Sequence, residues 1–258
     1  HEAFQIVELW HSGHERDLKR GDNPEYDAFV NMIDDLGDAA KELSAGSEPW
    51  ATFGDATVHV YRPSSYVKST ANMTAEERRE AIHNECAVIK ISFAGRSLIL
   101  TGDSNRAAWE SIVKHYGDDD QLAADVISAS HHGSRTFFKK SKDDDAYREH
   151  LERIDPDVVV VSVGGDNPHD HPHGDALDEY SNKADTTYRT DENLTVAVTI
   201  DAAGTMTWTV GDEAFQSEYQ LAEDDDNDGG DGGSGGSRTT SGYSRRTAPT
   251  VISGGRYA

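Results

Sequence analysis

The sequence predicts an α/β fold, and two observations lead to that prediction. Short apolar runs typical of strands alternate along the chain with longer segments that have the apolar spacing of amphipathic helices. Three of the runs stop abruptly at polar residues; they cover 97–100, 124–129 and 158–163. Strand pairs that alternate with helices predict sheets covered by helices. At 258 residues the chain can bury one substantial core.

The first half of the chain begins with a strand expected over 4–10. A helix is expected over 26–43, because Pro24 suits a first helical turn and apolar residues then recur near helical spacing. Residues 57–61 alternate as a strand. The segment Thr74-Ala75-Glu76-Glu77 is a capping box, which predicts that a short helix begins there.

The second half begins with an expected hairpin over 87–100, with its turn at Ala94-Gly95-Arg96. Helical spacing predicts one helix over 104–116 and a second over 143–154, the latter ended by a proline. A final hairpin is expected over 193–210.

The composition is strongly acidic, with 48 Asp and Glu against 24 Lys and Arg and a net charge of -24. Acidic residues are spread along the chain, which is typical of a halophile-type surface and predicts a high-salt environment. A polyanion that repels nucleic acid is the alternative, but high salt screens such charges within a few ångströms. Cys86 is the only cysteine, so the chain has no internal disulfide and no cysteine-based zinc site. No run approaches the roughly 20 apolar residues of a membrane span, so no membrane segment is expected in this chain.

Two regions are expected from the change in composition near Glu223. Residues 1–222 are expected to form the folded domain. Residues 223–258 are acidic and then rich in Gly, Ser and Thr, so they are expected to be a disordered tail or linker.

Polar residues that can carry chemistry follow the three apolar runs. Asp103 ends the segment Leu100-Thr101-Gly102-Asp103, and His131 and His132 lie in Ser130-His131-His132-Gly133-Ser134. The third run leads into a loop that contains Asn167, His169, His171 and His173. Strand ends are where α/β scaffolds present their functional groups. Asp and His side chains there are ligands of the kind that hold zinc, manganese or iron.

In these motifs the chain resembles the hydrolases of the metallo-β-lactamase fold, in the branch of the soluble domain of the DNA-uptake competence protein ComEC. The order of Leu100–Asp103, His131–Ser134, Val160–Gly164 and then Tyr188–Asp191 is the order in that branch. The resemblance runs from about residue 6 to about residue 210. It implies an αββα sandwich of the metallo-β-lactamase type, incomplete at the N-terminus, and a metal-dependent hydrolase.

One departure from the family concerns its principal metal motif, His-x-His-x-Asp-His, which is absent. The chain begins with His1, and we expect the motif to lie upstream, so that activity requires that missing segment. The alternative is a homologue that has lost its metal and binds a partner or nucleic acid without catalysis.

The resemblance also implies roles for individual residues. Two divalent metal ions, Zn²⁺ or Mn²⁺, are expected, with Asp103 as the bridging carboxylate and His131 as a ligand. His132 and His171 are the expected catalytic residues, His171 by contacting substrate or protonating the leaving group. The expected substrate-binding residues are Ser134, Asn167 and His173.

Simpler explanations compete with these roles. Asp103 is also suited to being a turn residue after Gly102 or to capping the helix that follows it. Ser134 is suited to capping the next helix, and the His-rich loop to being a solvated turn.

The expected reaction is hydrolysis of a phosphodiester, with nucleic acid or another phosphodiester as the substrate. A hydrolase of another ester or lactone on the same fold is the alternative enzyme. We find no convincing additional metal-binding histidine of the kind that those branches carry, and this favours the nuclease-like branch.

Overall fold

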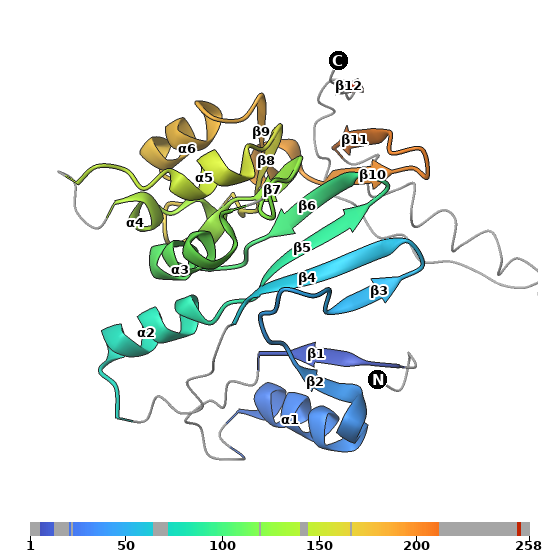
Figure 1. Cartoon of the computed structure of the whole chain (residues 1–258). Coiled ribbons are helices and arrows are strands. Elements are labelled where there is room, and N and C mark those ends of the chain that lie inside the picture. Colours follow the sequence, from blue (N-terminus) through green and yellow to red (C-terminus); the bar gives the residue numbers. More distant parts are fainter. Residues whose placement is uncertain are drawn as a thin grey trace, which may run out of the picture.

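The structure is a computed structural model that describes residues 6–12, 21, 23–63, 72–118, 120–139, 144–165, 167–211 and 252–253. Its centre is a seven-stranded mixed sheet (Figure 1). In spatial order the strands are β3 (Ala51–Phe53), β4 (Ala56–Arg62), β5 (Val88–Phe93), β6 (Arg96–Leu100), β7 (Val126–Ser128), β8 (Val158–Val161) and β9 (Thr186–Arg189). Pairing is antiparallel from β3 to β6 and parallel from β6 to β9.

Helices and two smaller sheets surround this sheet. The helices are α1 (Pro24–Leu36), α2 (Ala75–Asn84), α3 (Arg106–Tyr116), α4 (Arg135–Phe138), α5 (Glu149–Ile154), α6 (Gly174–Ser181) and α7 (Thr190–Asn193), with 3-10 turns η1 (Gly37–Ala39) and η2 (Ser130–Gly133). Strands β1 (Leu9–His11) and β2 (Ala40–Glu42) pair in parallel. Strands β10 (Val196–Ile200), β11 (Met206–Val210) and β12 (Ile252–Ser253) form an antiparallel sheet.

The parallel half of the central sheet is buried on both faces. Ile99, Ile127 and Val159 lie on one face, in the main core with the buried residues of α3, α4, α5 and α6. Their neighbours Val126 and Val158 face the other way and pack against residues of β10 and β11 in a second core. Helices therefore cover one face and the β10–β11 hairpin covers the other (Figure 1). Such two-sided burial explains why the two inner strands β7 and β8 are almost wholly apolar.

This arrangement confirms the predicted α/β class. The hairpin of β5 and β6 turns at Ala94-Gly95, and the hairpin of β10 and β11 lies where it was expected. At the start of α2 the capping box is complete, with the Glu77 amide donating to the Thr74 hydroxyl and the Glu77 carboxylate accepting from the Thr74 amide.

The expected helix over 26–43 is wrong at its end. Helix α1 stops at Leu36 because Gly37 takes a φ of +53°, and the chain continues through a 3-10 turn into β2. A positive φ suits glycine, which has no Cβ, and it cannot continue a right-handed helix.

The expected helix over 143–154 is also too long. Its helical part, α5, begins at Glu149. The Tyr147 amide donates to the Phe138 carbonyl, and the Tyr147 ring packs against Phe137 with centroids 6.3 Å apart. Tertiary packing of this aromatic residue therefore replaces the first turn of the expected helix.

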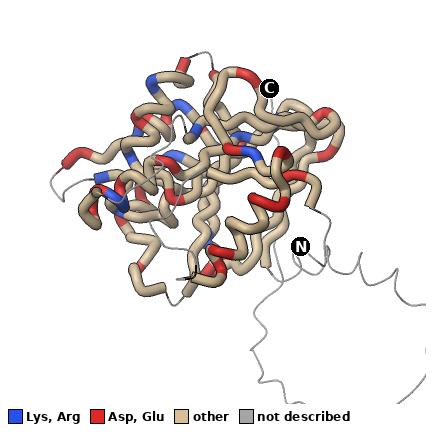
Figure 2. The backbone as a smooth tube through the Cα atoms, turned by 90° about the horizontal axis from the view of Figure 1, so that it is seen from below, with Lys and Arg blue, Asp and Glu red and all other residues tan. Residues whose placement is uncertain are grey.

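Most of the expected tail, 223–258, lies outside the described residues. Within it, Ile252 and Ser253 pair with Trp208 and Thr207 of β11. None of the helices in the described ranges has the length and apolar content that a membrane span needs. Figure 2 shows Asp and Glu residues on many elements of the described chain.

Candidate active site

Three segments that carry the predicted site meet at one edge of the central sheet. Strands β6, β7 and β8 are parallel neighbours, with Leu98 opposite Val126 and Val126 opposite Val158. Their carboxyl ends therefore open at the same edge, and the loops that follow them bring the predicted residues together. Crevices at such strand ends are the usual place for ligands in open α/β sheets.

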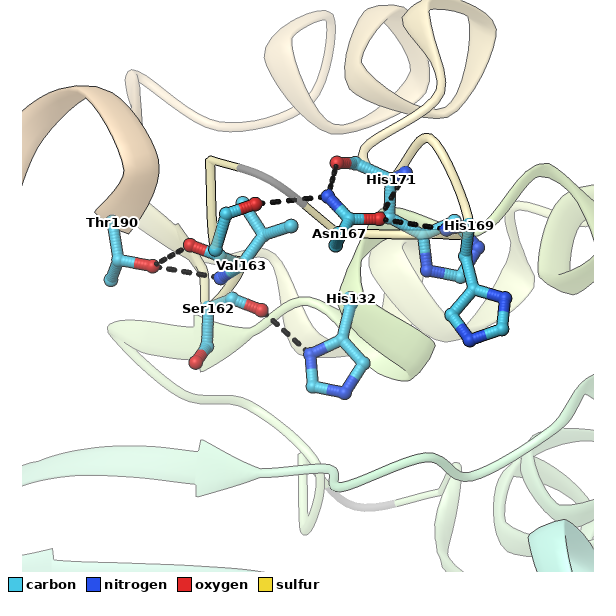
Figure 3. A pocket seen from close by; sticks show the side chains of 8 residues that line it. His132, Ser162, Val163, Asn167, His169, His171 and Thr190 are labelled. Atoms are coloured by element: carbon cyan, nitrogen blue, oxygen red, sulfur yellow. Dashed lines mark hydrogen bonds between the residues drawn. The ribbon is translucent and has the colours of Figure 1, made fainter.

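Asp103 and His132 lie in contact with each other at this edge. The Nε2 atom of His132 lies 3.0 Å from Oδ1 of Asp103. The other ring nitrogen, Nδ1, lies 2.6 Å from the Ser162 carbonyl oxygen (Figure 3). About half of each side chain in the pair is exposed, so the pair lies at the surface and not in the core.

The two contacts of His132 have a chemical consequence. A carbonyl oxygen accepts hydrogen bonds, so Nδ1 must carry the proton. In a neutral ring Nε2 then has a lone pair, which would face the lone pairs of the Asp103 carboxylate. The contact is favourable when a proton, on either group, or a bound cation lies between the two atoms. Two ligands on one tetrahedral zinc lie about 3.3 Å apart, close to the observed separation.

Asp103 does not cap the helix that follows it. Helix α3 begins at Arg106, and its N-cap is Asn105, whose side chain accepts from the Ala108 amide at 2.9 Å. The carboxylate of Asp103 is thereby left for the pair with His132. This outcome removes the helix cap as an explanation for Asp103, although Asp103 does lie in a turn with Gly102.

His131 lies in a cluster of imidazole rings. Its ring centroid is 4.5 Å from that of His83 and 5.6 Å from that of His171. Burial, together with the neighbouring His83, lowers the pKa of His131 from 6.5 to about 4. His131 is therefore neutral at neutral pH, which is the form that binds a metal ion.

Sequence reasoning assigned no role to His83. It lies in the last turn of α2, far from the other site residues in sequence. The only local signal was its position just before a strand, and its contact with His131 depends on how α2 packs. The structure therefore adds His83 to the candidate site.

The backbone around the histidine pair has an unusual conformation. His131, His132 and Gly133 have φ values of +50°, +54° and +74°. Positive φ is uncommon for residues with a Cβ and often marks functional sites. A Cβ added at Gly133 would lie 2.8 Å from Cβ of Pro172, so only glycine fits where this loop meets the His-rich loop.

The His-rich loop is held together by Asn167. Its amide nitrogen donates to the carbonyls of Gly164 and His171, at 2.9 and 2.7 Å. Its Oδ1 accepts from the amides of His169 and His171 (Figure 3). Both N–H donors of Asn167 are therefore used within the loop. These bonds order the loop, which is a turn with Pro168, His169 and Asp170 exposed at its tip.

A cavity of about 320 Å³ lies between this loop and His132. Its lining residues are His132, Ser162, Val163, Gly164, Asn167, His169, His171 and Thr190. Thr190 belongs to the Tyr188–Asp191 motif, and its hydroxyl bonds to the backbone of Val163. Partial burial lowers the pKa of His171, and the neighbouring His173 lowers it further.

Ser134 and His173 lie beside the site and have structural contacts of their own. Ser134 is 2% exposed, and its hydroxyl lies 2.9 Å from that of Thr136. Its side chain does not cap α4. Nδ1 of His173 accepts from the Arg135 amide at 3.2 Å, and the His173 amide donates to Gly133. The roles of these two residues in substrate binding remain predictions.

Comparison with known proteins gives limited information. No protein-family model matches the chain. The chain is 26% identical over 114 residues to ComE operon protein 3 of Bacillus subtilis (strain 168). That match covers 44% of this chain and 13% of the relative, so the chain spans a small part of the relative's length.

Proposed function

We propose that the protein is a metal-dependent hydrolase that cleaves phosphodiesters, with nucleic acid as the substrate class. The observation that carries this proposal is the contact between Nε2 of His132 and Oδ1 of Asp103, with Nδ1 committed to a carbonyl. A divalent cation between these groups would relieve the facing lone pairs. The cation would be bound by a carboxylate oxygen and an imidazole nitrogen, which are donor atoms that such ions commonly have in proteins.

The proposed metal ligands are Asp103 and one imidazole of the adjacent pair. His131 was expected from the sequence and is kept neutral by burial. His132 is the better placed of the two in this structure, because its ring already reaches Asp103. The Ser162 carbonyl fixes the orientation of His132, as outer partners of metal-bound histidines commonly do. Zn²⁺ or Mn²⁺ bound here would polarise a phosphoryl group and activate water.

The proposal requires ligands beyond these residues. Among the described residues, no three His, Cys, Asp or Glu side chains are arranged to hold a metal ion. A catalytic zinc takes three protein ligands, and a second ion needs more. A His-x-His-x-Asp-His segment upstream of His1 would supply them.

The neighbouring residues have separate proposed tasks. His171 lines the cavity and lies against His131, where it can contact a substrate oxygen or deliver a proton to the leaving group. The Thr190 and Asn167 side chains fix two walls of the cavity by donating hydrogen bonds to the backbone carbonyls of Val163 and His171. The cavity beside the pair would hold the substrate group next to the scissile bond.

The arrangement of layers supports the finer fold proposal. Helices, the central sheet and the β10–β11 hairpin are stacked in that order, and this is compatible with three layers of an αββα sandwich. We propose the metallo-β-lactamase sandwich as the fold. The partial similarity to a competence operon protein agrees with DNA as the substrate.

A second candidate is a binding domain without catalysis. Among the described residues, no three potential metal ligands lie grouped together. A domain that had lost its metal would have this feature. A hydrolase acting on another ester or lactone is the third candidate, and only a panel of substrates separates it from a phosphodiesterase.

The test is a hydrolysis assay with the protein as its gene encodes it. Purified protein is incubated with Mn²⁺ or Zn²⁺ and with a phosphodiester, single-stranded DNA, a lactone and a thioester. We expect cleavage of the first two, abolished by chelator and by Asp103→Asn. The matched control is Asp55→Asn, an equal change at an exposed turn. Cleavage of the lactone or thioester alone supports the third candidate, and no cleavage of any substrate supports the binding domain.

A further inference from the structure

A closed cluster of polar side chains lies beneath the histidine loop. Trp109 of α3 donates its indole N–H toward two hydroxyls, Ser104 Oγ at 3.0 Å and Ser130 Oγ at 2.9 Å. The hydroxyl of Tyr180, from α6, accepts from the Ser130 amide at 3.0 Å. All four residues are 0% exposed. Buried hydrogen bonds of this kind fix geometry strongly, because a lost partner leaves a polar group without water.

The cluster connects the two segments that carry the Asp103–His132 pair. Ser104 directly follows Asp103, and Ser130 directly precedes His131. Trp109 bonds to both serines, so one rigid indole sets the distance between the segments. The His131 amide adds a backbone link to the Gly102 carbonyl at 3.1 Å. Trp109 of α3 and Tyr180 of α6 are both buried. The spacing between the Asp103 segment and the histidine segment is therefore fixed by buried side chains and does not depend on exposed ones.

The loop needs such support because of its backbone. His131 and His132 both have a positive φ, which residues with a Cβ rarely adopt. Such conformations persist only where the surrounding structure determines them. Tyr180 fixes the residue at which this segment begins, because it binds the Ser130 amide.

We propose that Trp109 and Tyr180 are positioning residues, which hold Ser104 and Ser130 so that Asp103 and His132 face each other at bonding distance. The inference rests on the proposed function for its catalytic consequence only. The mechanical part, that the buried cluster holds the loop in its left-handed conformation, stands on the hydrogen bonds alone.

The test compares two tyrosine variants in the protein as its gene encodes it. Tyr180→Phe removes the acceptor of the Ser130 amide. Tyr61→Phe is the matched control, because Tyr61 is also buried and loses one hydroxyl hydrogen bond, to the Gln121 carbonyl at 2.7 Å. Amide hydrogen exchange is measured for residues 130–134 and for β5. Ser130→Ala is a second variant, which removes a hydroxyl acceptor of Trp109 without altering an aromatic core residue.

We expect Tyr180→Phe and Ser130→Ala to speed exchange in residues 130–134 at least tenfold, with β5 unchanged, whereas Tyr61→Phe leaves both regions unchanged. In the hydrolysis assay, kcat should fall at least tenfold in the first two variants, with KM within about twofold of the wild type. Unchanged exchange in residues 130–134, or equal acceleration in every region, overturns the inference. A wild type without phosphodiesterase activity defeats the proposed function, and the exchange data still decide the positioning role.

Discussion

His150 offers a stability test that is independent of any activity. It is fully buried in the main core, and neither ring nitrogen has a hydrogen-bond partner among the described residues. Its ring stacks on Tyr147 at 5.3 Å and contacts Phe137 at 4.8 Å between centroids. Burial lowers the pKa of His150 from 6.5 to about 3, because the charged imidazolium cannot be solvated there.

The direction and size of the effect follow from this pKa. Between pH 6.5 and 3 the unfolded chain binds a proton at His150 and the folded chain does not. Acidification therefore favours unfolding. The contribution is fully present above pH 6.5 and is lost as the pH falls, at about 1.4 kcal/mol per pH unit. Two units of acidification, from pH 6.5 to 4.5, should cost about 3 kcal/mol through this residue.

The assay is urea unfolding at several pH values, for the wild type and for His150→Leu, at constant high salt. Leucine is apolar and cannot bind a proton, so the difference between the two proteins isolates the histidine from the many carboxylates. We expect the variant to gain about 3 kcal/mol relative to the wild type between pH 6.5 and 4.5. The control His115→Leu, at an exposed position of α3, should show little change. Parallel pH profiles for the wild type and His150→Leu would mean that His150 has the same pKa in the folded and unfolded chain, contrary to this prediction.

Three further predictions concern the loop, the site and the surface. Gly133→Ala should destabilise the protein by about 1–3 kcal/mol in urea unfolding, because of its φ of +74° and its contact with Pro172, whereas Gly46→Ala should be nearly neutral; equal effects would contradict this. Asp103→Asn should abolish hydrolysis, whereas His171→Ala should cost about 10²–10⁴-fold in kcat; an active Asp103→Asn variant would reverse the ranking. The melting temperature, followed by circular dichroism, should rise steeply with salt because screening relieves repulsion at a net charge of -24. Removal of residues 223–258 should lower it only slightly, because Ile252 and Ser253 are the two described residues of that segment that pair with β11. A melting temperature independent of salt would count against the halophile-type surface.

The parts of the fold that could be predicted are those that local chemistry determines. The apolar runs of β6, β7 and β8 are buried on both faces, so their composition alone identified them. The α2 capping box is likewise local. The proximity of Asp103 to the histidine pair followed from the expectation that neighbouring strand ends open at one edge.

The features that could not be predicted depend on packing between distant segments. His83 reaches His131 only because α2 packs beside the loop, and no spacing in the sequence carries that information. The choice of His132 as the partner of Asp103 depends on the left-handed backbone at both histidines. Asn167 fits its motif, but its use in holding the loop was visible only from four hydrogen bonds.

The central claim is that Asp103 and the His131–His132 pair hold a divalent metal ion at the edge of the sheet. The most direct measurement is anomalous X-ray diffraction at the zinc and manganese absorption edges, on crystals of the protein as its gene encodes it, grown with each metal. We expect an anomalous peak within about 2.0–2.2 Å of an Asp103 carboxylate oxygen and an imidazole nitrogen of the pair, absent in Asp103→Asn. A peak confined to His169, His171 and His173, or no peak at either edge, would contradict it.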